Sequence, residues 1–208
     1  APGSNVLYPE GFPYGATLHG KPVYVNWYSP STAAAFTSLR DEAEGLAFLR
    51  ERQIEYVIGY PNDPGLPGTR AWALRGFLAR YGLPLVQAGD HVLYRVEGSE
   101  IPYVTAYSDA ATHTVEAEPR LFGSVNTGTA TAIRYNAEFA CASDAGYFGA
   151  QINWDNGKFY YHEVPCSTAA VQFVEAVPVP PGATGGELWG RVSGTGSATL
   201  TQLIIETH

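Results

Sequence analysis

Two runs of alternating residues, on either side of Asn156-Gly157, carry the side chains with the clearest chemistry in this sequence. An Asn-Gly pair between such runs predicts a hairpin with a two-residue type I′ turn, because both turn positions need a positive φ. This turn sets the register of the hairpin and places Asn153 opposite Tyr160. One face of the hairpin is then apolar, and the other carries the amides and rings of Tyr147, Gln151, Asn153, Tyr160 and His162.

A face built from rings and amides suits a sugar, because aromatic rings pack on the C–H faces of a sugar and amides bond to its hydroxyls. The alternative is an ordinary outer face covered by water. Trp189 and Arg191 alternate with Leu188 and Val192, so they also point away from the core. They join the binding face if their strand neighbours the hairpin, whereas burial of Trp189 under a loop is the competing interpretation.

A second candidate pocket lies in the first half of the chain. Ligands of open α/β sheets gather at the carboxyl ends of the strands. Two predicted strands end on the same side with polar and aromatic residues, namely Asn26, Trp27, Tyr28, Asn62 and Asp63.

The sequence lacks the spaced motifs that mark common catalytic sites. It has no GxGxxG, no P-loop, no GxSxG, no HExxH and no Asp-x-Asp pair, and its five histidines are scattered. We therefore predict no catalytic residue, no metal and no cofactor within this chain. Carboxylates that converge only in the fold, such as Glu116 or Glu118 with Glu138, leave a secreted hydrolase as an alternative.

The two cysteines, Cys141 and Cys166, predict a disulfide that closes a loop of 24 residues. Such a bridge favours an oxidising compartment outside the cytoplasm. The alternative is two buried free thiols.

Composition excludes several classes of function. The chain has 208 residues, of which 45% are hydrophobic and 15% charged, which is typical of a globular protein. The net charge is −8, and neither half has a basic patch, so nucleic acid is a poor partner. No apolar run is long enough to span a bilayer. A chain that starts at Ala1 and contains no Met is expected to be a processed or excised piece of a longer protein.

The periodicity of the sequence changes near residue 98. Residues 1–98 alternate between strand and helix patterns, with a helix predicted from Ser38 to Arg52, and indicate a small α/β domain. Residues 99–208 contain closely spaced strand patterns with Gly, Pro and Ser between them, and they indicate an all-β antiparallel sandwich that is jelly-roll-like.

Three segments carry a resemblance to a known family: GATLHGKPVYVNWYSPS, LRDEAEGLAFLRERQIEYVIGYPND and FLARYGLPLVQAGDHVLYRV. Together they resemble the soluble domain that follows the last membrane span in bacterial multi-span glycosyltransferases of the C-type, which use polyprenyl-phosphate-linked sugars. The match covers Gly15 to Val96. The acidic catalytic residues of that family lie between membrane spans, and nothing here corresponds to them. The second half is similar in pattern to carbohydrate-binding modules.

The resemblance implies a location on the periplasmic or extracellular face of the membrane. It also implies a non-catalytic role in binding a glycan or a lipid-linked sugar acceptor, with the membrane-embedded remainder of the same polypeptide as partner. The competing interpretations are a protein-interaction module of the cell envelope and the secreted glycoside hydrolase named above.

Overall fold

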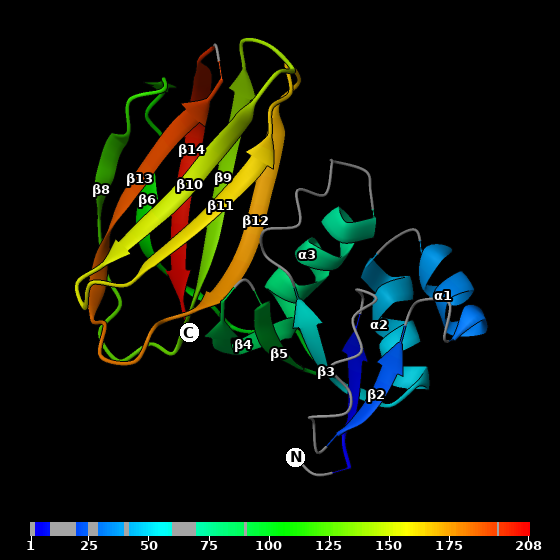
Figure 1. The fold of residues 1–208 in the computed structure, drawn as a ribbon. Coiled ribbons are helices and arrows are strands. Elements are labelled where there is room, and N and C mark those ends of the chain that lie inside the picture. The colour runs from blue at the N-terminus through cyan, green and yellow to red at the C-terminus, as the bar shows by residue number, and fades with distance from the viewer. Residues whose placement is uncertain are drawn as a thin grey trace. The chain divides into compact units, whose positions relative to one another are not determined.

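The computed structural model describes residues 3–8, 20–24, 29–39, 42–59, 70–89, 91–194 and 196–208. The chain divides into two compact units. Described residues up to Ile101 form the first unit, and Pro102–His208 form the second (Figure 1).

The first unit contains a five-stranded sheet in the order β2-β1-β3-β5-β4. Strand β1 is parallel to β2 and β3, whereas β5 is antiparallel to β3 and β4. The strands are β1 (Asn5–Tyr8), β2 (Lys21–Tyr24), β3 (Ile54–Gly59), β4 (Gly82–Ala88) and β5 (His91–Val96). The described helices are α1 (Pro30–Thr37), α2 (Glu42–Glu51) and α3 (Arg70–Tyr81). Leu7, Val57 and Val92 lie fully buried in the sheet core.

The helix predicted from Ser38 to Arg52 is wrong at its start. Ser38 ends helix α1, where its N–H bonds to the carbonyl oxygen of Ala34, and a separate helix begins at Glu42. Pro30 occupies the first turn of α1, where a missing N–H costs nothing. The sequence pattern hid this helix because its Ala-rich run has no clear apolar stripe.

The second unit is a sandwich of two antiparallel sheets, which confirms the predicted fold of this half. One sheet has the order β11-β10-β13-β8, and the other has the order β12-β9-β14-β6, with β7 also paired to β14 (Figure 1). Successive strands alternate between the sheets except at β6–β7 and at the β10–β11 hairpin, as in a jelly roll. The strands are β6 (Val104–Asp109), β7 (His113–Val115), β8 (Arg120–Asn126), β9 (Ala132–Cys141), β10 (Tyr147–Trp154), β11 (Phe159–Pro165), β12 (Val171–Pro178), β13 (Gly185–Ser193) and β14 (Ala198–Thr207).

The core of the sandwich lies between the two sheets. Phe139 of β9 and Phe148 of β10 stack across the interior with ring centroids 4.3 Å apart. Alternate residues of β9 and β10 are fully buried, because every second side chain of a strand points to the same face.

The predicted disulfide is present. Cys141 ends β9 in one sheet, Cys166 directly follows β11 in the other, and their Cα atoms lie 5.5 Å apart. The bridge therefore joins the two layers of the sandwich covalently. Within the described ranges, none of the helices combines the length and the apolar character that a membrane crossing requires.

Removing the bridge is expected to destabilise the sandwich. The double variant Cys141→Ala/Cys166→Ala should lower the free energy of unfolding by about 3 kcal/mol, since the unfolded chain regains the entropy of an open loop. Urea denaturation followed by fluorescence measures the change. Reduction of the unaltered protein is the matched control and should give a loss of similar size, whereas equal midpoints for oxidised and reduced protein would contradict the expectation.

Candidate functional site

The turn between β10 and β11 differs from the predicted type I′ turn. The N–H of Gly157 donates to the carbonyl oxygen of Trp154 at 3.0 Å. The N–H of Trp154 donates to the carbonyl oxygen of Lys158 at 2.9 Å. Gly157 has φ +80°, whereas Asn156 does not adopt a positive φ. The loop is thus three residues long, a β-turn followed by a left-handed glycine that forms a bulge.

This extra loop residue shifts the hairpin register by one position. Asn153 pairs with Phe159, and Gln151 pairs with Tyr161. The predicted pairing of Asn153 with Tyr160 is therefore wrong. Since side chains alternate along a strand, a shift by one residue exchanges the two faces of β11. Phe159 is consequently 68% exposed.

Tyr160 and His162 lie in the interior, so they are wrong as members of an exposed binding face. Their side chains are 2% and 0% exposed. The hydroxyl of Tyr160 donates to the carboxylate of Glu175 on β12, and Nδ1 of His162 lies 3.2 Å from the same carboxylate oxygen. The ring of His162 packs on Phe173, with centroids 5.0 Å apart. These contacts compensate for the burial of a carboxylate.

The other five candidates from the sequence share the outer face of the β11-β10-β13-β8 sheet. They are Tyr147, Gln151, Asn153, Trp189 and Arg191. Strand β13 pairs with β10 directly, with Gln151 opposite Trp189. Trp189 is in turn opposite Leu121 of β8. One row across the four strands therefore reads Tyr161, Gln151, Trp189 and Leu121.

Tyr161 is held down against the sheet. A Cβ added to Gly149 would lie 2.9 to 3.2 Å from atoms of the Tyr161 ring, so the ring rests directly on the backbone of β10. The phenol donates to Glu163 Oε1 at 2.6 Å and accepts a bond from Arg191 at 3.1 Å. The Arg191 guanidinium lies 5.2 Å from the ring centroid. Burial first, and then the bond to Glu163, raise the pKa of Tyr161, so this side chain stays a neutral phenol near neutral pH.

The remaining polar groups of this face are paired along their strands. The indole N–H of Trp189 donates to Glu187 at 3.1 Å. The side-chain amide of Gln151 donates to the side-chain oxygen of Asn153 at 2.6 Å. A second row, next to the first, consists of Phe159, Asn153 and Glu187. We use "the outer face" below for the surface formed by these two rows with Tyr147, Gly149, Glu163 and Arg191.

Six members of the outer face were missed from the sequence: Leu121, Gly149, Phe159, Tyr161, Glu163 and Glu187. For β11, the sequence did contain a signal that indicates the correct register. Glu163 and Val164 adjoin at the end of the strand, and the predicted register points the carboxylate inward and the valine outward. Burial of Val164 with exposure of Glu163 requires the register that the structure has.

The second candidate pocket, at Asn26, Trp27, Tyr28, Asn62 and Asp63, lies outside the described residues and stays a prediction.

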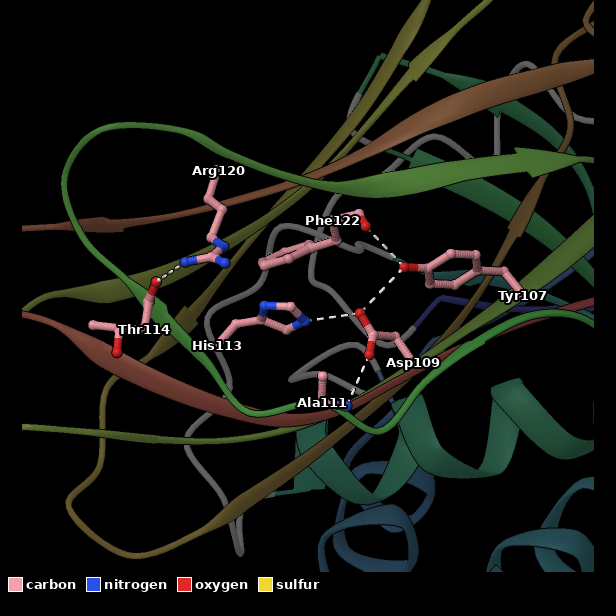
Figure 2. A network of polar contacts seen from close by, with 7 residues as sticks. All are labelled: Tyr107, Asp109, Ala111, His113, Thr114, Arg120 and Phe122. Atoms are coloured by element: carbon pink, nitrogen blue, oxygen red, sulfur yellow. Dashed lines mark hydrogen bonds and ion pairs between the residues drawn. The ribbon is translucent and has the colours of Figure 1, made fainter.

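A second polar cluster lies at the turn between β6 and β7 (Figure 2). Nε2 of His113 is 2.7 Å from Asp109 Oδ2, while Asp109 Oδ1 accepts a bond from the N–H of Ala111 at 2.8 Å. Tyr107 donates to the carbonyl oxygen of Phe122 at 2.9 Å and lies 3.4 Å from Asp109. The backbone bond from Ala111 and then His113 lower the pKa of Asp109.

A His–Asp pair supports nucleophilic catalysis only when a hydroxyl or thiol bonds to the imidazole. Among the residues that the structure describes, no such group bonds to His113. The cluster therefore ties β7 to β6 across residues 110–112. Nor do the described ranges contain three His, Cys, Asp or Glu side chains grouped as metal ligands.

No protein-family model matches the sequence, and no curated protein matches it. Solved structures similar to the chain include a carbohydrate binding module from Cellvibrio mixtus lichenase 5A, in complex with cellotriose, at 11% identity and a TM-score of 0.32, covering 50% of this chain and 95% of that one. Another is the CBM22-1 xylan-binding domain of Paenibacillus barcinonensis Xyn10C, at 9% identity and a TM-score of 0.35. That match covers 50% of this chain and 95% of that one.

The enzymatically active domain of tailspike protein 4 from bacteriophage CBA120 is also similar, at 15% identity and a TM-score of 0.35. That match covers 41% of this chain and only 13% of the tailspike chain. With TM-scores below 0.5, these similarities do not determine what this chain binds.

The register makes opposite predictions for two adjacent tyrosines. Tyr160→Ala should lower the free energy of unfolding by about 3 kcal/mol or more, because it opens a cavity and removes the hydroxyl that donates to Glu175. Tyr161→Ala should cost about 1 kcal/mol or less, because its ring lies on the outer face. Urea denaturation of both variants measures the difference. A larger loss for Tyr161→Ala would mean that the register is the one first predicted.

Asp109 makes the turn between β6 and β7 sensitive to acid. Because its pKa is lowered in the folded state, its stabilising contribution is complete above the ordinary aspartate pKa and is lost as the pH falls through the lowered value. Asp109→Asn should therefore have a lower free energy of unfolding than the unaltered protein at about pH 5. This difference in free energy should become smaller towards about pH 3. Urea midpoints at both pH values measure this. A gap that stays constant or widens in acid would contradict it.

Proposed function

We propose that the outer face of the β11-β10-β13-β8 sheet binds carbohydrate. The observation that carries this proposal is the row formed by Tyr161, Gln151 and Trp189, in which an amide lies between two rings on three neighbouring strands. Aromatic rings provide apolar surface for the C–H faces of a sugar, and the amide and carboxylates beside them bond to hydroxyls.

The spacing of the row fits a short stretch of a glycan chain. Tyr161 and Trp189 are separated by one intervening strand, which places their Cα atoms roughly 10 Å apart. This is about the length of a disaccharide. One ring would stack on each of two sugar units, while Gln151 lies beneath the linkage between them.

The side chains of the row are ordered before any ligand arrives. Tyr161 is fixed by Glu163, Arg191 and the bare backbone of Gly149. Trp189 is fixed by its bond to Glu187. Binding to side chains that are already ordered costs less conformational entropy, which increases affinity for a weakly held ligand such as a sugar.

We further propose an extracytoplasmic setting, as the glycan- or acceptor-binding region of a membrane glycosyltransferase. The resemblance of Gly15–Val96 to the soluble domain of C-type enzymes supports this parent, with a lipid-linked sugar and the membrane-embedded remainder of the polypeptide as partners. The disulfide between Cys141 and Cys166 supports an oxidising compartment such as the periplasm or the cell exterior.

A second candidate function is the docking of a partner protein on the same face. Phe159 is 68% exposed and Leu121 is 46% exposed, at opposite sides of the rows. Large exposed apolar side chains around a polar centre are also found in protein interfaces.

Affinity electrophoresis through gels that contain soluble polysaccharides tests carbohydrate binding. Tyr161→Ala and Trp189→Ala should each weaken retardation by about tenfold, because each removes one stacking surface worth ~1.4 kcal/mol. Gln172→Ala, an exposed residue of β12 in the opposite sheet, is the matched control and should bind normally.

Circular dichroism of each variant shows that the fold is retained. If the unaltered protein is retarded by no polysaccharide, or if Gln172→Ala weakens binding as much as Tyr161→Ala does, carbohydrate binding at the outer face is wrong. Capture of a partner protein that depends on Phe159 would then favour the second function.

A further inference from the structure

We infer that the outer face selects uncharged glycans and rejects polysaccharides that carry carboxylate or sulfate groups. This inference rests on the proposed function, because it specifies the class of carbohydrate that the same face would bind. It comes from the charges and the hydrogen-bond donors that the face presents.

Two carboxylates and one guanidinium lie on the outer face, at Glu163, Glu187 and Arg191. The Arg191 guanidinium lies 5.2 Å from the centroid of the Tyr161 ring and bonds to its hydroxyl, and that hydroxyl in turn bonds to Glu163. The single cation of the outer face therefore bonds to a phenol, and the same phenol bonds to a carboxylate. The net charge of the face is negative.

The three other cations of the second unit are Arg120, Arg134 and Lys158, which is exposed in the β10–β11 loop, and they do not outweigh the acidic residues of the unit. Residues 102–208 carry four Lys or Arg against ten Asp or Glu. Arg134 is paired with Glu206 in the opposite sheet, at 2.6 Å. Arg120 bonds to the carbonyl oxygen of Thr114 at 3.1 Å. A polyanion that approaches the face consequently meets repulsion at long range as well as in contact.

The hydrogen-bonding groups of the face point to the same class of ligand. A carboxylate only accepts bonds, and it has sites for about four. The indole of Trp189 and the phenol of Tyr161 each donate one bond to a carboxylate, which leaves further acceptor sites on Glu187 and Glu163. Sugar hydroxyls can donate to these sites, whereas a uronate or sulfate group brings only more acceptors. The carboxylates therefore favour hydroxyl-bearing sugars, and the negative net charge of the face disfavours an anionic group.

The test compares neutral and acidic soluble polysaccharides with the unaltered protein. Xyloglucan, mixed-linkage β-glucan and galactomannan serve as neutral probes, and polygalacturonate, alginate and heparin serve as acidic ones. At about 0.02 M salt the best neutral probe should bind at least about tenfold more tightly than any acidic probe. Raising the salt to about 1 M shortens the Debye length to about 3 Å and should narrow this ratio, while neutral binding changes little.

Glu163→Gln and Glu187→Gln isolate the charge, because each keeps the shape and one acceptor oxygen of the carboxylate. Each should reduce the ratio of neutral to acidic binding by at least about threefold. Glu138→Gln, on β9 in the opposite sheet, should leave the ratio unchanged.

The two proposals fail in different ways. If no polysaccharide of either kind binds, both are wrong. If acidic probes bind as tightly as neutral ones, and Tyr161→Ala abolishes that binding, carbohydrate binding stands and the selectivity for uncharged glycans is wrong.

Discussion

The left-handed backbone of Gly157 determines which side of strand β11 faces the interior. Its φ of +80° closes a three-residue loop in place of a two-residue one, and every side chain of β11 is placed accordingly. The loop is braced by the connection between β12 and β13, where Thr184 donates to the carboxylate of Asp155 through its N–H and, at 2.7 Å, through its hydroxyl. A slip by one residue would invert the strand and dismantle the row of Tyr161, Gln151 and Trp189.

The interior and the outer face depend on the same register. Tyr160 and His162 contact Glu175 from the inner side of β11. Tyr161 and Glu163 alternate with them along the strand and lie on its outer side. In the slipped register Glu163 would point into the core and Glu175 would lose its bond from the hydroxyl of Tyr160. Because unpaired buried carboxylates are costly, the interior cluster disfavours that alternative and keeps the aromatic row in place.

Much of the second unit was predictable from the sequence, because period-two alternation and closely spaced turn residues both indicate a sandwich. The disulfide followed from two cysteines, each at the end of a predicted strand, and five of the seven candidate residues of the sandwich do share one face. The prediction that Tyr160 and His162 are exposed was wrong for a local reason. Phe159, Tyr160 and Tyr161 are three rings in succession, so the strand itself does not indicate its inner side, and Asn-Gly is compatible with loops of two or three residues. The resemblance to C-type glycosyltransferases concerns a half whose candidate pocket falls outside the described residues.

The bridge between Cys141 and Cys166 encloses the whole β10–β11 hairpin in a covalent ring. Tension applied through the backbone on either side would pass through the sulfur–sulfur bond and bypass residues 142–165. The hairpin that carries Tyr161 and Gln151 would therefore keep its length while neighbouring strands peel away.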